Sequence, residues 1–277
     1  MKLLKAVVSS LALISTCNVY ADVPLHEATV SLKNDKITHA TTPGTHVTTV
    51  DIDGKLVSMG FSGWSDNAGF LNDTLKSGTI DGWYNCDINE VGCTDQNRKY
   101  GYGIENSESG DSHSADNYSG GGDFDMFLFT FSEDVTLAGA GFSWMNGDNG
   151  TNEVTVAGIS DINAFFSGTS ATWQNVKANI ISGTLGHFGI NAKGANGLYE
   201  SKFETITGKA QYWLVGAYNT IFDEVGSQSG DGVGLKLSTL DISIAKTTTT
   251  TEVSEPGALA LMSLGLGLVL YRRKRRA

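Results

Sequence analysis

The sequence predicts an all-β fold: a single jelly-roll-like β-sandwich with long loops, flanked by an N-terminal signal helix and a short C-terminal transmembrane helix. Three observations favour this class. The 277 residues include 34 glycines and only 3 prolines, a composition typical of many turns made by Gly, Asn and Asp. Apolar residues alternate over short runs, as half-buried strands require. A helical apolar period is not sustained in the middle of the chain.

One domain is expected over residues 22–245, a length that a single hydrophobic core supports. Residues 175–181 could form one short helix. We expect strands at residues 45–52, 55–63, 124–131, 135–144, 153–159, around 180–181, 202–207, 212–218 and 232–245.

The expected strand over residues 124–131 is apolar on both of its faces. Phe127, Phe129 and Phe131 share one face because side chains alternate along a strand, and Met126 and Leu128 share the other. A strand with two apolar faces belongs in the middle of a sandwich or barrel.

Two irregularities are expected between the strands. Residues 145–152 contain Asn-Gly and Asp-Asn-Gly, which favour a hairpin loop with positive-φ positions. In the last strand the apolar alternation changes phase near Ser238 and Thr239, which predicts a β-bulge there.

The first 21 residues predict a secretory signal peptide. Lys2 and Lys5 precede an apolar stretch over residues 6–14, and Val19-Tyr20-Ala21 is a small-x-small cleavage pattern that ends at Ala21. The apolar stretch is too short for a spanning helix, which needs about 20 residues, so cleavage after Ala21 is expected. Cys17 offers a lipoprotein alternative.

The C-terminal segment predicts a short membrane helix with a basic end. Residues 257–271 are almost wholly apolar, and the positive-inside rule keeps the cations that follow on the cytoplasmic side. At about 1.5 Å per residue this helix is somewhat shorter than a bilayer core of about 30 Å, which favours transient retention. The cations are Arg272, Arg273, Lys274, Arg275 and Arg276.

The motif before this helix is Ser254-Glu255-Pro256. Residues 253–277 resemble the PEP-CTERM sorting tail, which consists of a short acidic-proline motif, an apolar helix and a terminal arginine cluster in this order. Ser254 replaces the usual first proline of the motif. The resemblance implies transit through the Sec translocon, processing by an exosortase, and display at the cell surface or in an exopolysaccharide matrix. An ordinary tail anchor is the alternative. Residues 246–252 are threonine-rich and predict an extended stalk.

Charge separates the middle of the chain from its ends. The chain carries 19 basic and 30 acidic residues. Two basic residues lie in the signal and five in the segment 257–277, which hold no acidic residue, so 12 basic residues face 30 acidic ones between them, a net charge of −18. Such a surface repels phosphate backbones and argues against nucleic-acid binding. It attracts divalent cations.

Cys86 and Cys93 are the cysteines that remain after signal removal. An even pair in an exported domain predicts a disulfide. A redox or metal-thiolate role would need Cys-x-x-Cys or added His ligands, which the neighbouring sequence lacks.

The polar region 64–124 is where a binding site is expected, because long loops on a β scaffold commonly carry function. Clustered oxygen donors there could bind Ca²⁺, although no EF-hand loop is present and turn capping by Asp and Asn is the alternative. A lone His113 without a nucleophile or a second histidine is a poor catalytic or zinc candidate. The possible calcium ligands are Asp111, Asp116, Asn117, Asp123 and Asp125.

Part of this region also resembles the exosortase-dependent surface proteins. The resemblance rests on Trp64-Ser65-Asp66, on His113 with Asp116-Asn117, and on the stretch from Asp123 to Phe129 with the turn after it. It spans most of residues 60–245 and implies surface display without an assigned activity.

Aromatic side chains interleaved with polar loop residues suggest a second function, carbohydrate binding, because exposed rings are flat apolar platforms with polar rims. Core packing of these rings is the alternative. A secreted hydrolase, with acidic pairs such as Asp123 and Asp125, is a third possibility, but no catalytic motif supports it, and a non-enzymatic protein is expected. The candidate glycan contacts are Trp64, Trp83, Tyr84, Tyr100, Tyr102 and Tyr118.

Overall fold

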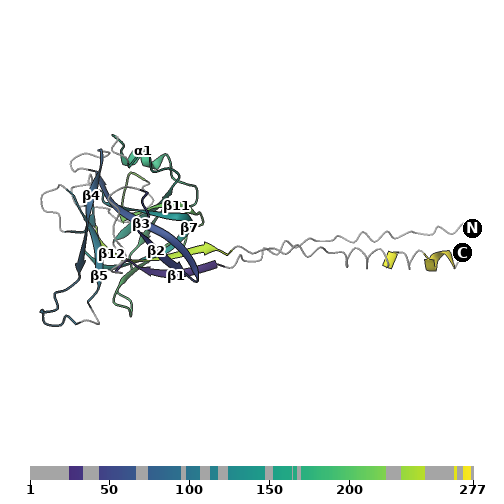
Figure 1. Ribbon diagram of the computed structural model, residues 1–277, viewed down its shortest axis with the longest axis horizontal. Coiled ribbons are helices and arrows are strands. Elements are labelled where there is room, and N and C mark those ends of the chain that lie inside the picture. The colour runs from purple at the N-terminus through teal and green to yellow at the C-terminus, as the bar shows by residue number, and fades with distance from the viewer. Residues whose placement is uncertain are drawn as a thin grey trace, which may run out of the picture. The chain divides into compact units, whose positions relative to one another are not determined.

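The computed structural model describes residues 25–33, 44–66, 74–94, 98–106, 113–117, 124–146, 152–163, 165–166, 170–222, 232–246, 265–266 and 271–275. The chain divides into a folded unit, Leu25–Ala245, and the two terminal segments outside it. The all-β prediction is confirmed: the folded unit holds twelve strands and one short helix in its described part. Figure 1 shows that these strands form a strongly curved sheet.

The elements follow one another in this order: β1 Leu25–Ser31, β2 Thr48–Ile52, β3 Lys55–Asp66, β4 Leu75–Tyr84, β5 Tyr100–Glu105, β6 Ala115–Asp116, β7 Met126–Met145, β8 Glu153–Ile159, α1 Trp173–Lys177, β9 Gly186–Gly189, β10 Tyr199–Lys202, β11 Ala210–Ala217 and β12 Gly234–Ala245.

Five antiparallel strands pair in a closed ring. β12 pairs with β5, β5 with β4, β4 with β3, β3 with β7, and β7 again with β12. The remaining strands extend this ring: β11, β8 and β9 follow β7, while β1 and β6 pair with β12, β2 with β3 and β10 with β7. These pairings do not confirm the two-sheet jelly-roll that was expected.

One long strand, β7, replaces the two strands expected over residues 124–131 and 135–144. Its first half pairs with β3 and β11, and its second half with β12 and β10. The polar residues between the halves do not form the expected turn, because strand pairing resumes directly after them, at Val135 with Ala210 and at Thr136 with Ser243. Lys55 Nζ lies 3.2 Å from Glu133 Oε2, and Lys209 Nζ lies 3.7 Å from Asp134 Oδ2.

The core has two parts, one on each face of β7. Phe127, Phe129 and Phe131 point into the ring, where the inner core lies. Met126 and Leu128 point to the other face, where a second core packs beneath α1 and the loops around it; Figure 1 shows α1 on this side of the unit. The prediction of a central strand with two buried faces is therefore confirmed.

The helix starts two residues earlier than expected. Thr172 caps α1: its hydroxyl oxygen accepts from the backbone N–H of Asn175, and the Asn175 side chain accepts from the backbone N–H of Thr172. This capping box fixes the start of the helix. Trp173 and Val176 then face the second core.

Of the other expected strands, the one over residues 153–159 is found with its expected bounds as β8, and the rest are found with shifted ends, except around residues 180–181 and 202–207. Only Ile180 makes an isolated bridge there, to Ile159, and β10 ends at Lys202. The bulge expected near Ser238 is confirmed by a register shift between Leu237 and Thr239.

Six strands were not expected: β1, β4, β5, β6, β9 and β10. Glycines interrupt the apolar pattern of β4 and β5, yet two of them leave room for close neighbours. A Cβ at Gly82 would lie 1.8 Å from the Tyr100 hydroxyl oxygen, and a Cβ at Gly103 would lie 1.8 Å from the backbone carbonyl oxygen of His113.

In the described part of the tail, residues 265–266 and 271–274 are helical. Among the described residues there is no helix with the length and apolarity needed to cross a membrane. The signal peptide with Ala21, most of the stalk, Ser254, Glu255, Pro256 and Arg276 lie outside the described residues.

Candidate binding face

The candidate site lies on the outer face of β4 and β5. Ile80 points into the inner core, and Gly82 is on the same face of β4. Asp81 and Trp83 are on the other face, which points outward, because side chains alternate along a strand. Trp83 is 47% exposed and is the only exposed aromatic side chain in the described part of the folded unit. Of the five aromatic candidates for glycan contact that the structure describes, it has the ring most exposed to solvent.

Lys236 extends this face onto β12 and β7. It pairs with Trp144 across the β12–β7 ladder, and its Nζ lies 5.8 Å from the Trp83 ring centroid and 5.7 Å from that of Trp144. Both distances are within cation–π range. Gly101 allows this approach, because a Cβ there would lie 3.0 Å from the Cβ of Lys236. Burial lowers the pKa of Lys236 below its ordinary value, and the Asp81 charge acts in the opposite direction.

His113 meets two carboxylates on the same face. Its Nδ1 lies 3.0 Å from Asp81 Oδ2 and 3.9 Å from Glu105 Oε2, and its ring centroid is 5.1 Å from that of Trp83. Gly103 makes room for it, because a Cβ there would lie 1.8 Å from the His113 carbonyl oxygen. His113 itself has a φ of 57°, in the left-handed region that non-glycine residues seldom adopt.

The three strand tyrosines form a ladder that continues the inner core. Tyr102 contacts Phe61 edge-on at 5.3 Å between centroids, Tyr100 contacts Tyr102 at 5.2 Å, and Tyr84 contacts Tyr100 at 5.0 Å. Burial, followed by the Asp81 charge, raises the pKa of Tyr100. These rings mainly pack against one another.

Tyr84 ends the ladder at a groove of about 530 Å³ beside the disulfide. The Arg98 guanidinium lies 3.6 Å from the centroid of the Tyr84 ring, and Lys33 Nζ lies 4.8 Å from it. Two cations therefore occupy this ring by cation–π contact, and Trp83, although Lys236 and His113 also lie beside it, keeps the larger exposed surface.

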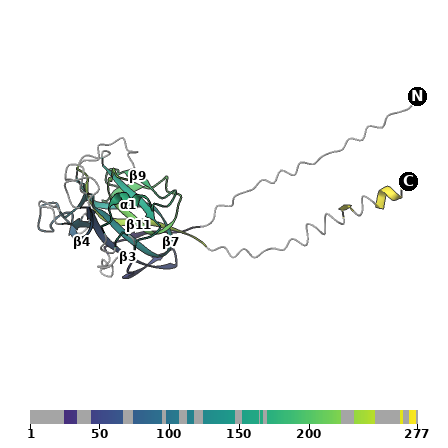
Figure 2. The same ribbon diagram turned by 90° about the horizontal axis from the view of Figure 1, so that it is seen from above.

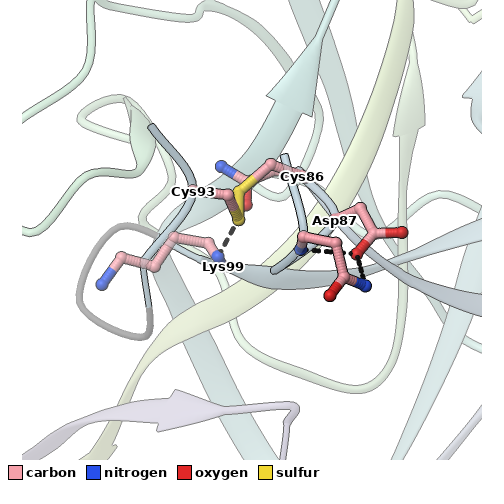
Figure 3. The surroundings of a disulfide bond; sticks show 6 residues. Cys86, Asp87, Cys93 and Lys99 are labelled. Atoms are coloured by element: carbon pink, nitrogen blue, oxygen red, sulfur yellow. Dashed lines mark hydrogen bonds between the residues drawn. A yellow bond between two sulfur atoms is a disulfide. The ribbon is translucent and has the colours of Figure 1, made fainter. Parts of the chain in front are cut away.

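The predicted disulfide between Cys86 and Cys93 is confirmed, with 6.0 Å between the two Cα atoms. Figure 3 shows it with Asp87 and Lys99 nearby. Asp87 Oδ1 accepts from the backbone N–H and from the side-chain amide of Asn89, both at 2.9 Å. The bridge and this turn shape the loop that borders the groove.

Trp64 lies inside the protein. It is 5% exposed, packs edge-on against Phe166 at 4.8 Å, and donates its indole N–H to the Ser62 hydroxyl oxygen at 2.9 Å. Its ring is thus part of the second core. Tyr118 lies outside the described residues.

The possible calcium ligands that the structure describes are buried and hydrogen-bonded. Asn117 donates to the Tyr218 carbonyl oxygen at 2.9 Å and accepts from the Val233 backbone N–H at 2.7 Å. Asp116 Oδ2 accepts from the Ser114 hydroxyl, and Asp125 Oδ2 accepts from the backbone N–H of Asp116. The calcium site stays a prediction.

Asp111 and Asp123 lie outside the described residues, and with Asp123 so does the Asp123–Asp125 pair considered for hydrolysis. Asp125 itself has no exposed surface.

Sequence reasoning missed four residues of this face: Asp81, Glu105, Trp144 and Lys236. Lys236 carried a signal, since a polar residue between buried Leu235 and Leu237 points outward from a strand. On β4, Asp81 and Trp83 alternate with Ile80 and Gly82, a pattern that would have placed both on one face, but a strand was not expected there.

An exposed indole flanked by two carboxylates and an ammonium group offers an apolar platform with hydrogen-bond donors and acceptors around it, which suits a polar ligand with flat apolar faces.

Comparison of the chain with protein-family models, with curated proteins and with solved structures found no match.

Proposed function

We propose that this chain is an exported, exosortase-sorted, non-enzymatic protein of the cell surface or extracellular matrix, associated with exopolysaccharide. The Sec translocon and an exosortase are its partners in transit, and the C-terminal helix holds it in the membrane before processing. Nucleic acid is not a partner, because the domain is strongly acidic.

The observation that best supports this proposal is the pairing of the two ends of the folded unit. Leu25 pairs with Ala245 across β1 and β12, and Figure 1 shows these strands side by side; Figure 2 gives the same unit turned by 90°. The first and last residues of the folded unit therefore lie next to each other. A domain displayed from a single attachment point would have this arrangement.

The aromatic residues lie at the other end of β1. Six residue steps separate Leu25 from Ser31, about 20 Å at about 3.4 Å per residue. Lys33, just beyond, lies over Tyr84, the neighbour of Trp83. Attachment at the end that holds Leu25 and Ala245 would leave the aromatic end accessible.

The sorting proposal is tested by neutralising the basic end, Arg272, Arg273, Lys274, Arg275 and Arg276, with glutamine. Retention on the cytoplasmic side depends on these cations, so the processed surface form should fall severalfold in a quantitative blot of surface fractions. Lys55→Gln with Lys209→Gln, at exposed ion pairs of the domain, is the control. Unchanged surface levels in the five-residue variant would count against a sorting tail.

Carbohydrate binding at Trp83 is the second candidate function, favoured by the exposure of this ring beside Asp81 and Lys236. We also propose that the domain is a jelly-roll-like sandwich. The two halves of β7 support this architecture because the first half pairs with β3 and β11 and the second half with β12 and β10.

Trp83→Ala should abolish the retardation of the protein in gels that contain the host's own exopolysaccharide, because it removes the open ring face. Leu56→Ala, at a side chain that is 67% exposed on β3, is the matched control and should leave the mobility unchanged. Equal retardation of both variants would place glycan binding elsewhere.

A further inference from the structure

The geometry points to a binding site for one divalent transition-metal ion at Asp81, Glu105 and His113. The three residues come from three segments, β4, β5 and the stretch that leads into β6. One ligand atom from each lies within 4.8 Å of the others. In the described part of the chain, this is the only group of three or more His, Cys, Asp or Glu residues that converges in this way.

The distances fit an ion between the three groups. Zinc lies about 2.0–2.2 Å from carboxylate oxygen and imidazole nitrogen, which places neighbouring tetrahedral ligand atoms about 3.4 Å apart. The observed distances from His113 Nδ1 are 3.0 Å to Asp81 Oδ2 and 3.9 Å to Glu105 Oε2, on either side of that value. Small side-chain rotations would bring all three atoms onto one ion.

The backbone holds the three groups in place before any ion binds. The β4–β5 ladder pairs Asp81 with Gly103 and Thr79 with Glu105, so the two carboxylates lie on adjacent strands. Gly103 then admits the His113 backbone directly above β5. A site preorganised in this way loses little conformational entropy on binding.

The donor set favours a particular class of ion. One imidazole nitrogen with two carboxylates suits Zn²⁺ and similar first-row ions. Ca²⁺ prefers six to eight oxygen ligands, and His113 supplies nitrogen instead. This site is therefore separate from the calcium site predicted at Asp111, Asp116, Asn117, Asp123 and Asp125.

The ion would remain open to solvent on one side. The side chains of Asp81, Glu105 and His113 are 32%, 46% and 37% exposed, so water or a ligand oxygen could complete the coordination. The Trp83 ring lies next to the imidazole. A bound ion would thus lie beside the aromatic platform and could take an oxygen of a ligand stacked there.

Lys236 sets a limit on the affinity. Its ammonium group interacts with Asp81 and repels a cation at the same carboxylate. Lys236→Met should therefore tighten zinc binding, whereas a structural role for the three residues predicts no such change.

The test is calorimetric titration of Zn²⁺ into the purified, EDTA-treated and dialysed protein. One Zn²⁺ per chain is expected for the wild type, and at least a tenfold weaker affinity for His113→Gln and for Asp81→Asn. His26→Gln is the matched control, because His26 also faces one carboxylate, Asp53, at 3.5 Å but has no second one in contact among the described ion pairs. It should bind zinc as the wild type does.

A second measurement uses only the wild-type protein and so does not depend on a variant that folds. In nitrogen-15 spectra of the imidazoles, Zn²⁺ should shift the Nδ1 resonance of one histidine, assigned to His113. Absence of zinc binding, equal binding by His113→Gln, or a shift at another histidine would each overturn the proposal.

Discussion

Two polar clusters of the domain use similar residues in opposite ways. Asp116, Asn117 and Asp125 are buried, and their oxygens and amide hydrogens serve backbone and side-chain groups of the fold. Asp81 and Glu105 are partly exposed and face the His113 imidazole instead. The first cluster joins segments that are far apart in the sequence, whereas the second joins two strands and a loop at the surface.

The difference shows where a polar cluster contributes to stability and where it is available for binding. A buried polar group must be hydrogen-bonded, and removal of its partner is costly. Exposed ion pairs contribute little to stability. Stability measurements should therefore separate the two clusters before any ligand is known.

The largest loss of stability is expected from Asn117→Ala. This change removes hydrogen bonds to Tyr218 and Val233 and leaves buried backbone groups without them, at a cost of about 3 kcal/mol. For a domain of this size that corresponds to a melting temperature roughly 6–12 °C lower. Thermal unfolding followed by circular dichroism measures it.

Asn196→Ala is the control for this variant. The Asn196 side chain also makes two hydrogen bonds, to Glu200 and to the Leu198 backbone N–H, but it is exposed. A similar melting temperature for the two alanine variants would contradict the distinction between the clusters.

Removal of the disulfide comes next in size. Cys86→Ser with Cys93→Ser opens a short ring, which should destabilise the protein by about 2.5 kcal/mol through the greater entropy of the unfolded chain. The melting temperature should fall roughly 5–10 °C, and gel retardation by exopolysaccharide should persist at temperatures where the variant is folded. Two titratable thiols in the native wild type would show that the bridge is absent.

Asp81→Asn should hardly change stability. Its ion pair with His113 is partly exposed, and such pairs contribute about 0–1 kcal/mol. The melting temperature measured in EDTA should therefore stay within roughly 3 °C of the wild type. A fall as large as that of Asn117→Ala would mean that the surface cluster is part of the structural framework.

Glu153 represents a third case, a carboxyl whose charge is unfavourable in the fold. Burial raises its pKa above the ordinary value of 4.5. The folded protein therefore favours the protonated carboxyl of Glu153. The stability that this protonated form contributes is fully present at pH values below the ordinary pKa and is lost as the pH rises through the raised pKa.

Glu153→Gln removes this dependence. At neutral pH the variant should melt above the wild type, and the difference should vanish towards pH 4. Melting curves across this range measure the effect, and a variant that is less stable at every pH would show that the charge of Glu153 is favourable.

The sequence predicted the parts of the fold that depend on local alternation. The two apolar faces of Phe127 to Phe131 identified a central strand, and residues 153–159 form β8 with the expected bounds. The disulfide followed from the cysteine count. β4 and β5 were missed because their glycines weaken the local pattern, whereas the need for Gly82 and Gly103 arises from contacts with Tyr100 and His113.

The surface cluster could not be predicted for the same reason. Asp81, Glu105 and His113 are separated by 24 and 8 positions in the sequence, and they meet only through the β4–β5 register and the crossing over Gly103. Neither feature has a local signature. Trp64 and Trp83 are equally aromatic in the sequence, and only tertiary packing buries the first and exposes the second.

The intact mass of the protein recovered from cell surface and medium, with and without the host's exosortase, tests the proposed export and sorting most directly. We expect a product that lacks residues 1–21 and has been cut near Glu255 and Pro256 only when the exosortase is present. A product that keeps the full basic tail in both strains would contradict sorting and identify an ordinary membrane-anchored protein.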